Sequence, residues 1–210
     1  MSRKITILGM GPTAYERKID MARHVTGEVW SLNNAYAYYA PSEGLRFARF
    51  FELHKWRYLK RWNPGHNGDH FQELAKIGCP VYVTEHIPVV PDQRLYPHID
   101  LFTHFGTNYF LGSPSLMLAL ALYEHDMGDT VDEIRVFGVD TSDPSHAQQR
   151  QSWTFWLSKA IDRGIDLTGT ALDCLAEPEK DEGLQGLREE IGKQIHESQR
   201  IDKTADVSQT

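Results

Sequence analysis

The chain has 210 residues and a formal net charge of -7 at pH 7, with 40% hydrophobic and 24% charged residues. This length and composition predict one globular domain with an appendage and a sizeable buried core. The acidic balance argues against a broad nucleic-acid-binding surface, which needs clustered lysine and arginine.

Apolar runs and cysteines narrow the class of protein further. The longest apolar run, Leu116–Tyr123, is too short to cross a bilayer, so no membrane span is expected. Cys79 and Cys174 lie far apart and follow no signal peptide, so we expect reduced thiols in a cytoplasmic protein. The ten histidines show no HxxxH or His/Cys spacing, and the sequence therefore predicts no protein-bound metal site.

In chain order, the sequence predicts a strand at 5–8, a helix at 14–24, strands at 28–32 and 46–53, a loop or lid at 57–69, a helix at 71–77, a strand at 80–84, an irregular stretch at 87–108, a helix at 113–125, a strand at 134–139, a helix at 145–163 and a strand at 165–168. Strands that alternate with helices form parallel βαβ units. The expected fold is therefore α/β, a doubly wound and mainly parallel Rossmann-like sheet in a single domain over residues 1–175. Residues 176–210 form an acidic polar tail, for which we expect a solvated helix, an oligomerisation helix or disorder.

The first strand runs directly into Gly9-Met10-Gly11-Pro12-Thr13. Two glycines let the backbone approach a phosphate closely, and proline suits the first turn of the following helix. The free N–H groups at that helix start favour an anion. Because position 14 is Ala14, the third glycine of the dinucleotide fingerprint is missing, and a tight turn without a ligand is the alternative.

Polar side chains also follow the second and third strands. Asn33 and Asn34 follow the second strand, and His54 follows the third. In an open parallel sheet, ligands bind in the crevice beyond the carboxyl ends of the strands. We expect the two asparagines either to hold a nucleotide or to make an asparagine turn, and His54 either to contact a substrate or to lie on the surface.

Further candidates begin or precede the two long predicted helices. Asp140 follows the 134–139 strand and is expected either to act in catalysis or to cap the following turn. His146 falls on the first helical turn, where the helix dipole keeps a base neutral and ready to accept a proton; a surface histidine is the alternative. Ser113 is expected to cap the 113–125 helix, with Pro114 at the first helical position.

Four motifs occur in a characteristic order: Gly9-Met10-Gly11-Pro12-Thr13, Ser31-Leu32-Asn33-Asn34, Gly112-Ser113-Pro114-Ser115 and Phe137-Gly138-Val139-Asp140. This set resembles a Rossmann-like group that contains the bacterial sialyltransferases acting on lipooligosaccharide and the archaeal 6-hydroxymethylpterin diphosphokinase-like proteins. The resemblance implies that Gly9, Gly11, Pro12 and Thr13 contact phosphate or ribose, Asn33 holds the nucleotide or sugar, Ser113 lies near the donor, and His146 is the general base.

The resemblance and the polar strand ends together imply a nucleotide-binding transferase. The first expectation is a glycosyltransferase that uses a small-molecule nucleotide-sugar donor, an unidentified acceptor and no tightly bound cofactor. The second is a diphosphokinase of the hydroxymethylpterin type, in which Asp140 and Asp143 hold Mg²⁺ against the phosphates of ATP. The third is a nucleotide-binding protein without turnover. Each is compatible with a homo-oligomer.

Overall fold

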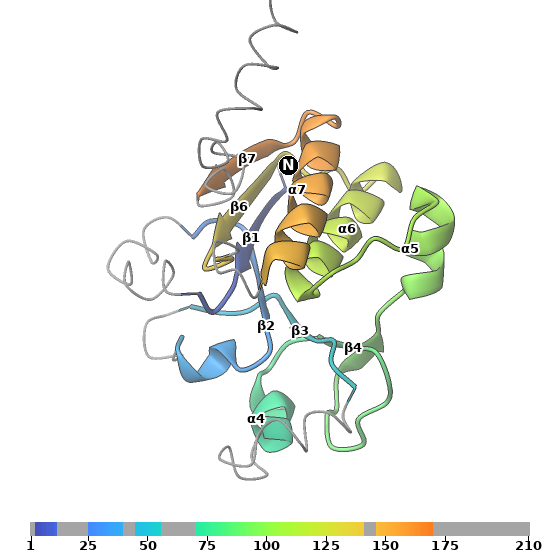
Figure 1. Cartoon of the computed structure of the whole chain (residues 1–210). Helices are drawn as coiled ribbons and strands as arrows, with labels where there is room; N and C mark the ends of the chain where they lie inside the picture. The colour runs from blue at the N-terminus through green and yellow to red at the C-terminus, as the bar shows by residue number, and fades with distance from the viewer. Residues whose placement is uncertain (1–2, 12–24, 40–44, 56–69, 141–145, 170–210) are drawn as a thin grey trace, which may run out of the picture. The chain divides into compact units, whose positions relative to one another are not determined.

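The computed structural model describes residues 3–11, 25–39, 45–55, 70–140 and 146–169. Within these ranges, seven strands form one sheet of parallel neighbours in the order β5-β4-β3-β2-β1-β6-β7 (Figure 1). The strands are β1 Lys4–Leu8, β2 Glu28–Leu32, β3 Arg49–Glu52, β4 Val81–Val83, β5 Gln93–Leu95, β6 Glu133–Phe137 and β7 Asp166–Gly169. The helices are η1 Ala35–Ala37, α4 His70–Lys76, α5 His98–Phe105, α6 Ser113–Asp126 and α7 Ala147–Ile161. The predicted α/β, doubly wound parallel fold is confirmed.

The strand order reverses at β1. From β1 the chain adds β2, β3, β4 and β5 on one side, and then returns to add β6 and β7 on the other. Leu8 of β1 pairs with Phe137 of β6, so these two strands end side by side while their connections diverge. Such a topological switch point is where open α/β sheets bind ligands.

Both faces of the sheet are covered. Side chains alternate along β1, so that Ile5 and Ile7 pack into one core and Leu8 into the other. The first core includes α6 and α7, which lie side by side (Figure 1), and the second includes Leu74 of α4. The apolar run Leu116–Leu122 is buried throughout in α6. None of the described helices is both long and apolar enough to span a bilayer.

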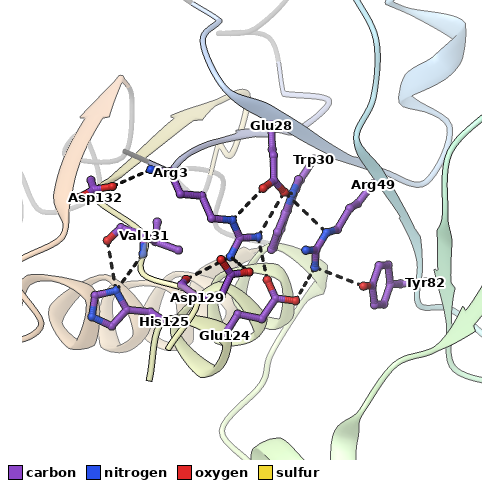
Figure 2. Close-up of polar contacts among 10 residues, drawn as sticks. All are labelled: Arg3, Glu28, Trp30, Arg49, Tyr82, Glu124, His125, Asp129, Val131 and Asp132. Atoms are coloured by element: carbon purple, nitrogen blue, oxygen red, sulfur yellow. Dashed lines mark hydrogen bonds and ion pairs between the residues drawn. The ribbon is translucent and has the colours of Figure 1, made fainter. Parts of the chain in front are cut away.

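A network of ion pairs joins the amino ends of the central strands to α6 (Figure 2). Arg3, just before β1, pairs with Glu28 of β2 and with Glu124 of α6, each at 2.8 Å. Arg49 of β3 also pairs with Glu124. Glu124 lies near the end of α6 and is paired at the amino ends of the strands. Because this 14-residue helix is about 20 Å long, its start lies at the opposite side of the sheet, where the strands end, which we call the carboxyl edge.

The stretch 87–108 was expected to be irregular, and this expectation is wrong because it contains β5 and α5. The three residues of β5 pair with β4 through the backbone, and two of their side chains are exposed, which leaves no apolar pattern. In α5, Leu101 is buried whereas Ile99 and Phe102 are exposed. Neighbouring elements, rather than local pattern, therefore hold this region in its fold.

The strand β2 has its predicted ends, η1 was not predicted, and the other described elements match their predicted type with shifted ends. The third strand is shorter than the expected 46–53, and α7 is shorter at both ends than the expected 145–163. The predicted helix at 14–24, the loop or lid at 57–69 and the tail at 176–210 lie outside the described residues.

Candidate functional site

The glycine motif lies where β1 and β6 end. The N–H of Gly9 donates to the carbonyl of Phe137 at 2.7 Å, and the N–H of Gly11 donates to the carbonyl of Gly138 at 2.8 Å. A Cβ on Gly9 would overlap the Gly138 carbonyl, and a Cβ on Gly11 would overlap the Asp140 carboxylate. Both glycines therefore let the two strand ends approach each other, and both N–H groups bond to β6. Pro12 and Thr13 lie outside the described residues.

Asp140 places a carboxylate directly against this turn. Its side chain occupies the space beside Gly11 and is partly buried. A phosphate bound at the same turn would therefore face a negative group unless a cation lay between them. Asp143, the second predicted carboxylate, lies outside the described residues.

Asn33, at the end of β2, combines an unusual backbone with an unpaired side-chain atom. Its φ is 55°, in the left-handed region, and its N–H donates to the carbonyl of Phe51 at 2.9 Å. Its Oδ1 is buried and has no hydrogen-bond partner in the described part of the chain. Asn34 instead precedes η1, and its carbonyl accepts from the N–H of Ala37 at 2.9 Å. Asn34 thus begins a backbone turn in which its side chain makes no capping hydrogen bond, while the side chain of Asn33 is left with an open acceptor.

Two hydroxyl groups that the sequence analysis did not assign to the site tie β1 to its neighbours. The hydroxyl of Ser31 donates to the carbonyl of Leu8, and that of Tyr39 donates to the carbonyl of Gly9, each at 2.8 Å. These bonds orient the carbonyl groups at the end of β1. Tyr39 lies shortly after Asn34 in the sequence, and this proximity was the available signal for its place at the edge.

A buried carboxylate, also missed by the sequence analysis, stands at the end of β3. Glu52 is 1% exposed, and its two oxygens bond Nδ1 of His54 and Nε2 of His70, each at 2.8 Å. Nδ1 of His70 in turn bonds the hydroxyl of Tyr36 at 2.7 Å. A charged residue inside an apolar strand was the signal that could have revealed it, since glutamate is almost never fully buried unless paired.

These hydrogen bonds decide the charge of the cluster. Burial alone would raise the pKa of Glu52, but the hydrogen bonds from His54 and His70 outweigh it and lower that pKa. The hydrogen bond to Glu52 raises the pKa of His54, against the opposing effect of partial burial. The cluster therefore keeps Glu52 ionised and favours the imidazolium form of His54.

The start of α6 lies at the same edge of the sheet. The N-cap residue is Gly112, with φ 97°, and Ser113 is the first helical residue, so the expected N-cap role of Ser113 is wrong. No side chain caps this end of the helix. Ser152 of α7 fixes the preceding loop, because its hydroxyl donates to the carbonyl of Tyr109 at 2.8 Å.

His146 is the N-cap residue of α7, partly buried, and its side chain makes no capping hydrogen bond. It therefore lies just before the helix rather than within its first turn. Its position after β6 places it at the carboxyl edge, as β6 points toward that edge and α7 starts there.

The fold thus brings most of the predicted residues to one edge of the sheet, and the described ones are Gly9, Gly11, Asn33, Asn34, His54, Ser113, Asp140 and His146. They lie at the ends of β1, β2, β3 and β6 and at the starts of α6 and α7. No group of three or more His, Cys, Asp or Glu within the described ranges is arranged to hold a metal ion. Together, the eight described site residues provide hydrogen-bonding groups, one carboxylate at the glycine turn and two histidines.

No protein-family model matches this chain, and no curated protein matches it in sequence. Among solved structures, it is similar to the sialyltransferase CstII from Campylobacter jejuni, described in complex with a substrate analogue, CMP-3FNeuAc. The two share 16% sequence identity, the similarity covers 80% of this chain and 86% of that chain, and the TM-score is 0.48. The fold class rests on the strand order itself, and the functional argument rests on the residues at the carboxyl edge.

Proposed function

We propose that this protein is a nucleotide-binding transferase whose donor is a nucleotide sugar, bound at the carboxyl edge of β1, β2, β3 and β6. The switch point between β1 and β6 supports this location, because open α/β sheets bind nucleotides there. In the proposal the nucleotide lies across the ends of β1 and β2. Its binding residues are Gly9, Gly11, Pro12, Thr13, Asn33, Asn34 and Ser113.

The observation that carries the proposal is the state of Asn33. A left-handed backbone costs about 1–2 kcal/mol at most residues other than glycine and less at asparagine, which tolerates it, and a buried acceptor without a donor costs about 1–3 kcal/mol. Such local costs concentrate at binding sites. A ribose hydroxyl or the exocyclic amine of a base would donate to Oδ1 and remove the second cost.

In the transfer step, the resemblance gives His146 the role of general base. The acceptor hydroxyl gives its proton to the imidazole, and its oxygen forms a bond to the anomeric carbon of the sugar. The bond from that carbon to the phosphate oxygen breaks, and its electron pair leaves with the nucleotide. Base catalysis of this kind contributes roughly a hundredfold to ten-thousandfold to the rate.

One observation favours a second candidate, an ATP-dependent diphosphokinase. A phosphate beside Gly11 would be repelled by the Asp140 carboxylate, and a Mg²⁺ ion between them would turn this repulsion into attraction. Nucleotide-bound Mg²⁺ needs only one or two protein carboxylates, so a single Asp140 fits this chemistry. A nucleotide sugar that binds without Mg²⁺ would contradict this second candidate.

A binding screen distinguishes the two. Thermal unfolding is followed with CMP, UDP, GDP, ADP, ATP and the common sugar conjugates, each with and without Mg²⁺. A ligand at a hundred times its dissociation constant stabilises the fold by about 2.7 kcal/mol, which raises Tm by several degrees. A response to a sugar nucleotide without metal supports the glycosyltransferase, and a Mg²⁺-dependent response to ATP supports the diphosphokinase.

The substitution Asn33→Gly tests the central observation. Glycine adopts a φ of 55° without strain, so the free protein should keep or raise its Tm. The lost acceptor should weaken nucleotide binding about tenfold, as expected for one hydrogen bond of about 1.4 kcal/mol. Gln72→Ala removes an exposed amide from α4 and is the matched control. Nucleotide affinity that is unchanged in Asn33→Gly would contradict the assignment.

A further inference from the structure

The cluster around Glu52 has no part in the function proposed so far, yet it holds one ring in a defined orientation. The carboxylate binds Nδ1 of His54 at 2.8 Å, and the backbone N–H of His54 also donates to it at 3.2 Å. The side chain of His54 is 44% exposed, whereas that of Glu52 is 1% exposed. The ring therefore points its Nδ1 inward, toward the buried carboxylate, which leaves Nε2 on the side of the ring away from Glu52.

The carboxylate that orients the ring of His54 is itself fixed by residues from two other elements, α4 and η1. His70, at the start of α4, bonds the second oxygen of Glu52, and Tyr36 of η1 bonds the far nitrogen of His70. The carboxylate is thus fixed on both sides, and His54 is the member of the cluster with an accessible ring. Within the described residues, Nε2 of His54 has no hydrogen-bond partner.

The open acceptor of Asn33 lies on the neighbouring strand end. The N–H of Asn33 donates to the carbonyl of Phe51, the residue just before Glu52. Because neighbouring strands lie about 4.8 Å apart, a ligand that donates to Asn33 reaches the end of β3 as well. The unpaired Oδ1 of Asn33 and the partly exposed ring of His54 therefore lie at the ends of two neighbouring strands.

We propose that His54 is a phosphate-binding residue of this site: as an imidazolium held by Glu52, it donates its Nε2–H to a phosphate oxygen of the nucleotide. Glu52 is then a positioning residue, which supplies the counter-charge and fixes the ring. This inference rests on the proposed nucleotide site.

The inference predicts how affinity depends on pH. The groups that act on His54 are Glu52 of β3, and through it His70 of α4 and Tyr36 of η1, with Lys55 next along the chain. The hydrogen bond to Glu52 raises the pKa of His54, so the imidazolium persists to higher pH. Affinity for a phosphate should be full below that pKa and fall as the pH rises through it.

The test compares ligands with and without a phosphate. Binding of CMP and of UDP to the wild-type chain and to His54→Gln is measured by calorimetry from pH 5.5 to 9, with cytidine and uridine as phosphate-free controls. The ratio of wild-type to variant affinity cancels the ionisation of the phosphate itself. We expect this ratio to be about tenfold at pH 5.5 and to approach one at pH 9, and the ratio for the nucleosides to stay near one.

A second variant tests the role of the carboxylate. Glu52→Gln should lower the pKa of His54, and it should move the pH midpoint of binding downward by the same amount. The pKa is measured by NMR on the imidazole signals of His54, which are identified because they are missing from the spectrum of His54→Gln. The side chain of His54 is 44% exposed and glutamine keeps a donor for Glu52, so we expect His54→Gln to fold even if Glu52→Gln does not.

The outcomes separate this inference from the function on which it rests. Nucleotide binding to the wild-type chain with a pH-independent affinity ratio would overturn the role of His54 and leave the nucleotide site standing. If the wild-type chain binds none of the nucleotides or nucleosides, both the proposed function and the role of His54 are wrong.

Discussion

Gly9 and Gly11 are equivalent in the sequence motif, but they differ in what a side chain added to them would meet. Neither has a positive φ, so backbone conformation does not require glycine at either position. At Gly9 the obstacle is the backbone carbonyl of Gly138, whereas at Gly11 it is the side chain of Asp140. A backbone obstacle stays in place unless the strand moves, and a side chain can be removed by substitution.

This difference gives a prediction for single residues. Gly9→Ala and Gly11→Ala should each lower the free energy of unfolding, by roughly 1–3 kcal/mol as for other overpacked sites, with the larger loss for Gly9→Ala. Adding Asp140→Gly should recover most of the loss in Gly11→Ala and none in Gly9→Ala, because the two positions meet different atoms. Urea unfolding of the four variants measures this. Equal recovery in both backgrounds would contradict the packing described.

Among the elements, α5 shows why the local sequence pattern was not enough to predict a helix within the stretch 87–108. It is held by side chains that are distant in sequence: Asp126 at the end of α6 bonds Nε2 of His104 in α5 at 2.7 Å and Arg163, just after α7, at 2.6 Å. One carboxylate thus links three helical segments. The hydrogen bond from Arg163 lowers the pKa of Asp126 from an ordinary 3.8 to about 2, against the effect of burial.

The link between these helices should weaken in acid. Because the pKa of Asp126 is lower in the folded than in the unfolded protein, its contribution is complete above about pH 4 and is lost as the pH falls through 2. Asp126→Asn should lower the free energy of unfolding at pH 7 by on the order of 1 kcal/mol, since the group is partly screened by solvent. The difference between variant and wild type should shrink between pH 4 and 2 in chemical denaturation. A difference that is constant over this range would show that the charge of Asp126 does not contribute.

In the described sheet as a whole, the amino ends and the carboxyl ends of the strands differ in how their polar groups are paired. At the amino edge, charged groups are mutually paired: Arg3 contacts Glu28, Glu124 and Asp129, each at 2.8 Å (Figure 2). At the carboxyl edge, Asn33 keeps an unpaired acceptor. The ion pairs at the amino edge stabilise the folded chain, whereas the unpaired acceptor of Asn33 can accept a hydrogen bond from a ligand. We therefore infer that the amino edge contributes mainly to stability and the carboxyl edge mainly to binding.

This separation is testable with one variant at each edge. Arg3→Gln removes the cation paired with Asp129 and one of the two arginines paired with Glu28 and with Glu124, and it should lower the free energy of unfolding by roughly 1–3 kcal/mol, between the values for surface and buried pairs. Its affinity for a nucleotide should equal that of the wild type at a temperature where both are folded. Asn33→Gly should show the opposite, with stability that is unchanged or higher and with weaker binding. Thermal unfolding and calorimetry on both variants check the pair, and a loss of affinity in Arg3→Gln would mean that the two edges are coupled.

The sequence by itself determined the features that depend on neighbouring residues. Alternating apolar runs predicted the parallel α/β fold, and the glycine turn, Asn33, His54 and Asp140 were all recognised as residues that follow strands. These signals are local, because periodicity, turn residues and strand ends are properties of a few consecutive positions.

Only the tertiary structure decided which of these strand ends are neighbours. It placed β6 beside β1, so that Asp140 lies against Gly11, and it left the Oδ1 of Asn33 without a partner. It also joined Glu52 to His70, which lies 18 residues away. The physical reason is that strand order, close contacts and buried hydrogen bonds are set by the packing of distant segments, which no local pattern in the chain encodes.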